Sequence, residues 1–454
     1  MKKEKGKKRI ALIIPPLLKG SSFHPLFPPL GLTYIAAVLE QEGHEIAVID
    51  CPICKFDHEK LMDELTSFHP DIVGISAMTT MIVSALQAAK NVKETCPEAT
   101  VVLGGPHATF MDEEILRQEP SVDIIVRGEG EYTMLELARF LPNWSKLADV
   151  KGITLRRNGK IFRTPPRPHI QDLDSLPYPA YHYLPMEKYR IYGRVHLPVM
   201  SSRGCPFQCT FCVASQIFGA KFRARSPKNV VDEMEWLRDN YGAEAISFHD
   251  DTLTLDKQRM LKICEEIKKR KVELPWGCQT RVDRVSKELL SKMREASCHE
   301  ASFGVESGSQ KIIDAVGKGI THEQCEKAVK WAKEENLFVA VSAILGYPGE
   351  TKETLQQTVD FVRRLEPDDA WLCIATPYPG TVLRALIESM GWKIHNDWNI
   401  YDTSHVVFEN PELPAEEILN ARKRFYNSFY TPKYMLRQAV KGYLKGNFYS
   451  RVMA

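Results

Sequence analysis

The sequence lacks any run of about 18 apolar residues, the length a membrane-spanning helix requires. It also lacks an excess of one charge: its formal net charge is +2, which argues against a broad nucleic-acid-binding surface. The basic N-terminus, MKKEKGKKRIALIIPPLL, does not match a signal peptide. Its apolar stretch is short, is broken by Pro15 and Pro16, and has no small-residue cleavage site. We therefore expect a cytoplasmic protein with no transmembrane segment.

A disulfide framework is also missing. The eleven cysteines are odd in number and scattered through 454 residues, which indicates a reducing compartment where thiolates can bind metal. The chain is too long for one ordinary domain, so we expect two large domains and a small third region.

The first third of the chain alternates short β-rich runs with amphipathic helical patterns. The predicted strands are 9–14, 45–50, 71–76, 100–105 and 122–128, and the predicted helices are 31–43, 58–68, 83–96 and 131–141. This alternation predicts a Rossmann-like, doubly wound parallel sheet in an α/β domain spanning 1–145. A segment rich in proline and tyrosine, 146–195, is expected to be an ordered linker.

The alternation then restarts. The predicted strands are 196–202, 244–250, 274–280, 300–306, 338–346 and 369–375, and the predicted helices are 227–241, 256–270, 286–297, 321–336 and 352–365. Six such units predict a (β/α)6 partial TIM barrel over 196–390, with its active site at the carboxyl ends of the strands. Residues 391–454 are expected to form a small, mostly helical C-terminal region.

Three cysteines lie in the loop after the first barrel strand. Cys205, Cys209 and Cys212 have the spacing C-x3-C-x2-C. Three thiolates can hold three irons of a [4Fe–4S] cluster and leave the fourth iron open to a small ligand. The alternative is zinc with a distant fourth ligand, but a structural zinc site would more often use a second C-x2-C pair, which is absent near this loop.

This motif at this position resembles the radical S-adenosylmethionine (SAM) superfamily, and the resemblance covers residues 196–390. It implies that the open iron chelates SAM and that an electron from the cluster cleaves SAM to a 5′-deoxyadenosyl radical. It also implies that Phe211 meets the adenine through its backbone. "FGVESGS" (303–309) resembles the motif that holds the SAM ribose and amino group, with Glu306 and Ser307 as candidates, and "AILGYPGET" (343–351) resembles the adenine-packing motif, with Gly346.

Three further polar residues end barrel strands. Arg281 could clamp the SAM carboxylate through its guanidinium, and Asp250 and Asp251 are expected to face the active site. We assign these three as candidate catalytic residues. Each also has an ordinary structural explanation, as an ion-pair partner or a helix cap. The Gly-Gly-Glu motif found after the second strand in the superfamily is replaced here by "FHDD" (248–251).

The first domain resembles the cobalamin-binding domain that precedes many radical SAM enzymes, over roughly 9–141. The resemblance rests on "PPLGLTYIAAVLEQEGHEIAVID", "PDIVGISAMTT", "VVLGGPHATF" and "VRGEGEYT". It implies a cofactor site formed by Ser76, Thr79, Thr80, Gly104, Gly105, His107, Glu129 and Gly130. The alternative is a flavodoxin-like domain of other use. No G-x-G-x-x-G follows the first strand, which weakens a dinucleotide-binding interpretation.

One departure concerns the cobalt ligand. Classical cobalamin domains supply histidine through Asp-x-His-x-x-Gly, whereas the loop here reads "PPLLKGSSFHPLFPPLG". We expect base-off cobalamin without a histidine ligand, its lower face meeting the 76–81 loop, with His24 as the alternative ligand. Cys51 and Cys54 form an isolated C-x2-C pair, which is weak evidence for a metal or redox site.

The two resemblances together imply a cobalamin-dependent radical SAM enzyme that transfers a methyl group from methylcobalamin to an unactivated carbon. "TPYPGT" (376–381), "GWKIHNDWNIYD" (391–402) and "RFYNSFYTPKYMLRQ" (424–438) resemble the family of the anaerobic magnesium-protoporphyrin monomethyl ester cyclase. A cyclase or rearrangement enzyme without net methylation is therefore the alternative. A non-catalytic cobalamin sensor is a third reading, against which the three intact cysteines and Glu306 argue.

The chemistry implies a small-molecule or lipid-like substrate and a reduced ferredoxin or flavodoxin as electron donor. We expect no nucleic-acid partner. The C-terminal stretch 429–454 mixes aromatic and basic residues, which could contact a membrane surface or could simply pack on the barrel.

Overall fold

The computed structural model of the protein describes residues 6–18, 27–157, 159–191, 193–436 and 438. The chain divides into two compact units. One contains the chain up to Arg190 together with Asp397–Asp402, and the other contains Ile191–Asn396 and the chain from Thr403 onward. A short piece of the C-terminal region thus belongs to the first unit.

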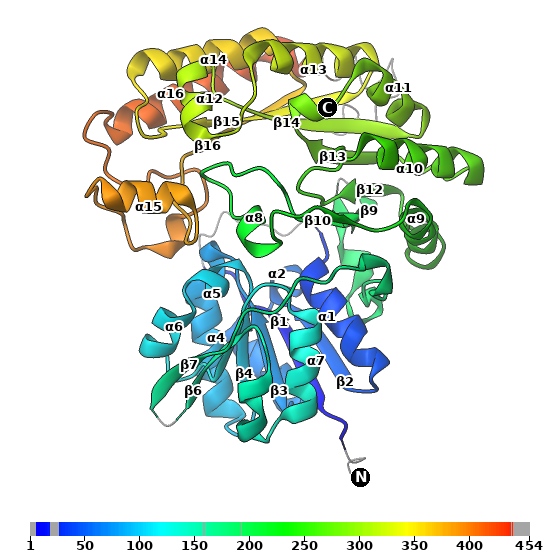
Figure 1. Cartoon of the computed structure of the whole chain (residues 1–454), viewed down its shortest axis with the longest axis vertical. Coiled ribbons are helices and arrows are strands. Elements are labelled where there is room, and N and C mark those ends of the chain that lie inside the picture. Colours follow the sequence, from blue (N-terminus) through cyan, green and yellow to red (C-terminus); the bar gives the residue numbers. More distant parts are fainter. Residues whose placement is uncertain (1–5, 19–26, 158, 192, 437, 439–454) are drawn as a thin grey trace. The chain divides into compact units, whose positions relative to one another are not determined.

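The first unit is built on a seven-stranded sheet with the order β2-β1-β3-β4-β5-β6-β7 (Figure 1). Its strands are β1 (Arg9–Ile14), β2 (Glu45–Asp50), β3 (Ile72–Ser76), β4 (Thr100–Gly104), β5 (Ile124–Val126), β6 (Ile153–Arg157) and β7 (Lys160–Arg163). The first five strands run parallel. Strand order reverses between β1 and β3, and ligands of such sheets bind at the carboxyl ends around this point.

Helices cover both faces of this sheet, with α1 and α7 on one face and α4 on the other (Figure 1). The helices are α1 (Leu30–Gln41), α2 (Cys51–Cys54), α3 (His58–Phe68), α4 (Ile82–Thr95), α5 (Pro106–Phe110), α6 (Asp112–Gln118) and α7 (Glu131–Phe140), with 3-10 turns η1 (Thr79–Met81), η2 (Trp144–Asp149), η3 (Leu173–Ser175), η4 (Tyr181–Tyr183), η5 (Met186–Lys188) and η7 (Trp398–Ile400). Alternate strand residues divide between two cores. Ala11 and Ile13 pack with α3 and α4, whereas Leu12 lies on the face of α7. The predicted doubly wound α/β fold is confirmed.

The main local difference lies in the segment 146–195, which the sequence predicts to be an ordered linker without strands. Residues Ile153–Arg157 and Lys160–Arg163 form a hairpin that adds two antiparallel strands to the first sheet, β6 pairing with β5 and β7 with β6. The sequence holds Asn-Gly at 158–159 between alternating residues, a dipeptide typical of tight hairpins. The proline-rich residues that follow masked this signal.

The second unit is built on a sheet with the order β16-β15-β14-β13-β12-β9-β8. The strands of this unit are β8 (Arg190–Ile191), β9 (Arg194–Val199), β10 (Ser202–Arg203), β11 (Arg223–Ala224), β12 (Ala245–Phe248), β13 (Trp276–Thr280), β14 (Cys298–Glu306), β15 (Phe338–Leu345) and β16 (Asp369–Ile374). Six of them, β9 and β12–β16, pair in parallel, which confirms the (β/α)6 partial barrel.

Helices such as α9, α10, α11, α13 and α14 lie outside this sheet, whereas α8 lies in the loop between β10 and β11 (Figure 1). The helices of the unit are α8 (Ala214–Ile217), α9 (Pro227–Tyr241), α10 (Lys257–Arg270), α11 (Lys287–Glu295), α12 (Gln310–Val316), α13 (His322–Glu334), α14 (Lys352–Leu365), α15 (Val382–Ser389) and α16 (Ala415–Phe429), with the 3-10 turn η6 (Val282–Arg284). The side chains of Ser226, Asp256, Ser286, Thr321 and Thr351 each accept a backbone N–H in the first turn of a helix. These N-caps fix where the chain turns from each strand-end loop into its helix.

Strand β16 is one edge of the barrel sheet, and side chains of α16 bond its backbone. Arg422 Nε donates to the Leu372 carbonyl at 2.9 Å, and the Tyr426 hydroxyl accepts the Leu372 N–H at 3.1 Å. One turn later, the Tyr430 hydroxyl bonds both the N–H and the carbonyl of Ala370, at 3.2 Å each. An open edge is a template for pairing with other chains, and α16 closes this one without a further strand.

Candidate active site

The three cysteines lie in a loop whose base is closed by a short antiparallel pair. β10 pairs with β11 on either side of the loop. Gly204 precedes Cys205 with φ of 89°, and a side chain at this position would collide with the Lys221 carbonyl. The Cys205 N–H donates to the Gly219 carbonyl at 3.2 Å. Only glycine fits this turn, which sets the first cysteine at the carboxyl end of β9.

The middle of the loop is attached to the far side of the barrel through Thr210. Its N–H and hydroxyl both donate to the Val316 carbonyl, at 2.9 and 3.1 Å, and its hydroxyl also lies 2.7 Å from the Tyr347 hydroxyl. The Thr210 carbonyl accepts the N–H of Leu383 at 2.8 Å. The loop is therefore held at several strand ends before any cofactor binds. Phe211 lies half-buried in it, between Cys209 and Cys212.

The three thiols lie close enough to influence one another electrostatically. Burial raises the pKa of Cys212 to about 11, and the charges of Cys209 and Cys205 raise it further. Burial also raises the pKa of Cys209, while Lys318 and Arg281 lower it. The Ala214 N–H donates to Cys212 Sγ at 3.4 Å. Thiolates in this loop would therefore lie near the positive charges of Lys318 and Arg281 and near the Ala214 N–H.

These donors fit a [4Fe–4S] cluster better than a single metal ion. Across the described ranges, no three His, Cys, Asp or Glu side chains converge tightly enough to hold one ion. A cluster needs a wider arrangement because each cysteine binds a different iron. Three thiols on one anchored loop provide that arrangement.

Arg281 lies beside the second cysteine. Its Nη1 donates to Cys209 Sγ at 3.9 Å, and its guanidinium carbon lies 3.6 Å from the ring centroid of Phe207. Nε and Nη2 pair with Asp283, at 2.9 and 3.2 Å, and Nη2 also donates to the Lys318 carbonyl at 2.6 Å. The guanidinium predicted to clamp the SAM carboxylate is therefore engaged mainly by the protein and by the cysteine loop.

Glu306 lies at the end of β14 in an unusual backbone conformation. Its φ is 62°, and the register with β15 shifts between Gly304 and Glu306. Its buried carboxylate is paired with Lys318, whose Nζ also donates to the Gly304 carbonyl at 3.0 Å. Non-glycine residues in this region carry strain that is often found at functional sites. Sequence reasoning identified Glu306 but missed Lys318, which follows a glycine and not a strand.

Two other residues of the predicted SAM motifs have structural contacts of their own. The Ser307 hydroxyl is fully buried and lies 2.9 Å from the Thr358 hydroxyl on α14. Gly346 has φ of 81°, and a Cβ there would lie 2.7 Å from Ile418 of α16. The missing side chain at Gly346 therefore allows another element to approach its backbone closely. In the structure that element is α16 of the same unit.

The two aspartates after β12 differ. Asp250 is buried and accepts the Ser201 N–H at 3.1 Å and the Ser201 hydroxyl at 2.7 Å, so it braces the end of β9. Asp251 is exposed, and its surroundings raise its pKa to about 6, mainly by desolvation and also through the charge of Asp250. Asp251 also contributes to the raised pKa of Cys212, which places it near the cysteine loop. Asp251 is the better candidate for contact with a ligand.

Most of the predicted cobalamin residues gather where β3 and β4 end. Gly105 has φ of 97°, and a Cβ there would lie 2.6 Å from the Ala77 carbonyl. Buried His107 lies with Nδ1 3.2 Å from the Thr79 hydroxyl. Ser76, Thr80 and Gly104 line the same edge and are partly exposed. Glycines and small hydroxyl side chains therefore gather at this edge of the sheet.

Glu129 and Gly130 instead serve internal packing. Glu129 Oε2 accepts the Ile170 N–H at 2.8 Å, and a Cβ at Gly130 would lie 2.9 Å from Ile35 on α1. His24 lies outside the described residues. Cys51 begins α2, and burial raises the pKa of both Cys51 and Cys54.

Sequence reasoning missed Trp398. The η7 turn packs on η1 and α4, and the Trp398 ring meets His107 edge-on with a centroid distance of 4.8 Å. Trp398 thereby contacts the core of the first unit. Nothing in the local sequence could have paired residues almost 300 positions apart.

Two family models match the chain, one for each unit. The B12 binding domain matches residues 20–138, and the Radical SAM superfamily matches residues 199–362. The chain is 37% identical over 430 residues to an uncharacterized methyltransferase of Pyrococcus horikoshii, covering 92% of this chain and 94% of that protein. It is 32% identical to the anaerobic magnesium-protoporphyrin IX monomethyl ester cyclase of Rubrivivax gelatinosus, covering 90% of this chain and 75% of that protein.

The chain belongs to the cobalamin-dependent radical SAM family, which includes methyltransferases and cyclases. The family's cofactors are a [4Fe–4S] cluster, SAM and cobalamin. The fold agrees with a solved structure of the radical SAM methyltransferase TsrM from Kitasatospora setae, which has cobalamin and a [4Fe–4S] cluster bound. That likeness has a TM-score of 0.71 and 20% identity, covering 84% of this chain and 75% of that one. Relatives whose names state a substrate act on small molecules.

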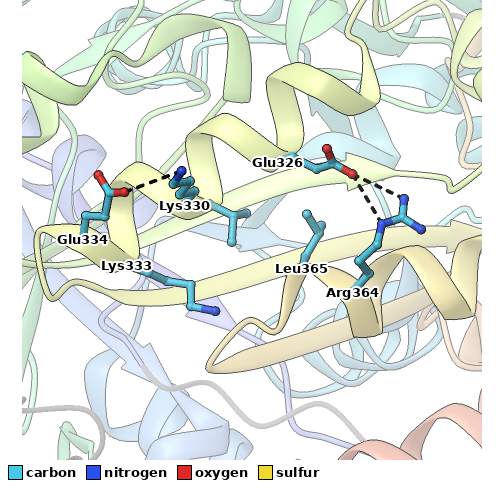
Figure 2. A pocket seen from close by; sticks show the side chains of 7 residues that line it. Glu326, Lys330, Lys333, Glu334, Arg364 and Leu365 are labelled. Carbon is cyan, nitrogen blue, oxygen red and sulfur yellow. Dashed lines mark hydrogen bonds and ion pairs between the residues drawn. The ribbon is translucent and has the colours of Figure 1, made fainter.

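A separate groove of about 580 Å³ lies between α13 and α14 (Figure 2). Its lining comprises Glu326, Val329, Lys330, Lys333, Glu334, Arg364 and Leu365. Its charges compensate one another, with Arg364 3.4 Å from Glu326 and Lys330 4.0 Å from Glu334. It is formed by outer helices, away from the strand ends that carry the cysteine loop. None of the helices in the described ranges is long and apolar enough to cross a membrane.

Proposed function

We propose that the protein is a radical SAM methyltransferase of this family that methylates an unactivated carbon of a small molecule. The observation that carries the proposal is the anchored three-cysteine loop at the barrel strand ends, in a chain that matches a methyltransferase over 92% of its length.

The residues have separate proposed tasks. Cys205, Cys209 and Cys212 hold the cluster, the bulge at Glu306 and the turn at Gly346 border the SAM site, and Asp251 faces the reaction space. Ser76, Thr80, Gly104 and Gly105 border cobalamin, whose lower face meets the 76–81 loop without a histidine ligand. When bound, these groups supply the radical and the methyl group, while the protein positions them and excludes water.

The test is anaerobic reconstitution with iron, sulfide and hydroxocobalamin, followed by SAM, dithionite and a panel of candidate small molecules. 5′-Deoxyadenosine and S-adenosylhomocysteine are measured together by mass spectrometry. Formation of both supports the methyltransferase. Replacing Cys205, Cys209 and Cys212 together with alanine removes three cluster ligands, so deoxyadenosine formation is expected to fall to background.

The Cys96→Ala variant is the matched control, because Cys96 belongs to the first unit and the cysteine loop to the second. Cleavage of SAM by the triple variant at the wild-type rate would contradict the proposed mechanism.

A cyclase or rearrangement enzyme is the second candidate, supported by the 32% identity to the Rubrivivax cyclase. It predicts deoxyadenosine without S-adenosylhomocysteine, in protein that holds cobalamin. A product of unchanged carbon count would then decide for it over the methyltransferase.

Two partner proposals accompany this function. Reduced ferredoxin or flavodoxin would supply the electron, and a lipid-like substrate or peripheral membrane contact would involve the C-terminus. Most of the stretch 429–454 lies outside the described residues. Liposome flotation with and without residues 430–454 tests the membrane contact, and equal flotation would end that idea.

A further inference from the structure

Arg281 has more fixed contacts than a free ligand-binding guanidinium needs. It follows β13 and is only 5% exposed. Phe207, between the first two cysteines, packs against its flat face at 3.6 Å, and Cys209 Sγ accepts from Nη1 at 3.9 Å. Asp283 and the Lys318 carbonyl hold the remaining donors. Every side of the group is occupied by the cysteine loop or by the elements that support it.

A neighbouring arginine shows what this arrangement adds. Arg284 also lies over Phe207, but at 5.1 Å, and its Nε pairs with Asp283 Oδ2 at 3.5 Å, an oxygen that Arg281 contacts as well. Its side chain is 41% exposed, against 6% for Arg281. The two cations share one aromatic ring and one carboxylate, yet only Arg281 has a recorded contact with a cysteine sulfur.

We propose that Arg281 is a positioning residue of the cysteine loop whose fixed charge makes the bound cluster easier to reduce. It holds Phe207 and Cys209 in place and directs a permanent positive charge at one ligand sulfur. This inference rests on the cysteine loop holding the cluster. It replaces the expectation that the guanidinium binds the SAM carboxylate.

The physical reason is electrostatic. Arginine stays protonated at all working pH values, so the charge does not vary. Hydrogen bonds to cluster sulfurs and nearby charge tune reduction potentials, and a cation favours the state that carries one more electron. Little water reaches Arg281, so its interaction is weakly screened, whereas that of Arg284 is largely screened. Asp283 opposes the effect by partly neutralising the same guanidinium.

The test measures the midpoint potential of the reconstituted cluster by redox titration followed by electron paramagnetic resonance. One electron passes from dithionite to the cluster, and Arg281 neither gains nor loses a proton. The Arg281→Gln variant is expected to shift the potential to a more negative value, and Arg281→Lys to shift it less. The Asp283→Asn variant is expected to shift it in the positive direction, because the carboxylate no longer offsets Arg281.

Arg284→Gln is the matched control and is expected to leave the potential near the wild-type value. An unchanged potential in Arg281→Gln with full iron content would overturn the proposal, as would an equal shift in Arg284→Gln. If Arg281→Gln fails to retain iron, Asp283→Asn decides: a positive shift supports the proposal and no shift overturns it. Iron content and visible absorption are also measured on the reconstituted wild type. A wild type that holds no cluster would show that the proposed function fails, which is a different result from a wild-type cluster whose potential does not depend on Arg281.

Discussion

Glu350 is a carboxylate fully enclosed by protein, in the turn that follows β15. Its Oε2 accepts the N–H groups of Gly346 and Tyr347, and Oε1 is buried with no hydrogen-bond partner among the described residues. Desolvation raises the pKa of Glu350 to about 8, although both N–H donors lower it. The folded protein therefore carries Glu350 mainly in the protonated form at neutral pH.

This shift predicts a stability that falls with rising pH. In the unfolded chain Glu350 loses its proton near pH 4.5, whereas in the folded chain it holds it up to about pH 8. The folded state binds more protons between these values, so its free energy of unfolding decreases across that window and levels off above it. From pH 6 to pH 9 the decrease from this residue is roughly 2 kcal/mol. Denaturation of the apoprotein at both pH values measures it.

The Glu350→Gln variant keeps the shape and both accepted N–H bonds but cannot ionise. We expect its stability to match the wild type near pH 6 and to exceed it at pH 9. Parallel pH curves for the two proteins would show that Glu350 is charged in the folded state.

Residue types and spacing identified the cysteine loop, Glu306 and Gly346 as candidates, and the structure places them where β10, β14 and β15 end. Sequence patterns could not show which polar groups the protein itself uses. Asp250 bonds Ser201, and Ser307 lies beside Thr358, more than 45 positions away in each case. A sequence pattern places such residues at strand ends, but only the fold reveals their partners.

At the scale of elements, α16 and the residues just after it protect the edge of β16 through side chains spaced four residues apart. Arg422 and Tyr426 lie on α16, Tyr430 is its C-cap, and Tyr434 lies beyond the helix and donates its hydroxyl to the Asp368 carbonyl. Within the helix a four-residue step returns to the same face, so Arg422 and Tyr426 reach the same strand. The tyrosine rings supply apolar packing below these polar groups, as Tyr426 stacks on Tyr430.

Removing the Tyr430 hydroxyl tests how much these side-chain bonds to the edge strand contribute to the free energy of unfolding. The Tyr430→Phe variant removes the phenol hydroxyl from the Ala370 carbonyl and from Asp369, whose Oδ1 keeps only the Ala370 N–H, at 2.9 Å. We expect a loss of about 1 to 3 kcal/mol in the free energy of unfolding, the range for buried polar groups left unsatisfied. Chemical denaturation measures the loss.

Asn427→Ala, on the exposed face of the same helix, is the control and is expected to change stability little. Equal stability of Tyr430→Phe and wild type would mean that water replaces the phenol at this edge.

Most elements were predictable because buried parallel strands and amphipathic helices have strong periodic patterns. The hairpin β6–β7 was not, since its exposed strand β7, Lys160–Arg163, offers little hydrophobic alternation. The short helices α2, α5 and α6 were also missed. They are seven residues or shorter, too short for a clear helical periodicity, and of the three only α2 has a side-chain N-cap, from Asp50.

At the scale of the whole molecule, the first unit is assembled from two separate parts of the chain. Asp397–Asp402 joins it long after the rest, and Tyr401 in this segment is fully buried. Trp398 supports His107, which in turn contacts Thr79 in the predicted cobalamin loop. The sequence indicated a C-terminal region but could not indicate that part of it belongs elsewhere, because packing between distant segments leaves no periodic signature.

Trp398→Ala is expected to loosen the end of β3, η1 and the start of α4. Hydrogen exchange in residues 76–86 would become faster, with the barrel strands unchanged, and cobalamin would bind more weakly in a spectroscopic titration. The ring fills space against the core of this unit, so its removal leaves a cavity there.

Trp392→Ala tests the same substitution in the other unit, where Trp392 stacks on Phe408. It is expected to leave exchange in residues 76–86 as in the wild type. Unchanged exchange in Trp398→Ala would show that the segment does not brace the loop.

Because the first unit contains two separate parts of the chain, it can be completed only late in synthesis on the ribosome. The core around His107 lacks Trp398 until the chain has passed residue 402. At a typical rate of roughly 5 to 20 residues per second, translation of the stretch from 191 to 396 takes roughly 10 to 40 seconds. The cysteine loop emerges within that interval. Iron–sulfur assembly can therefore act on the cysteine loop before the first unit is complete, although the first unit is encoded first.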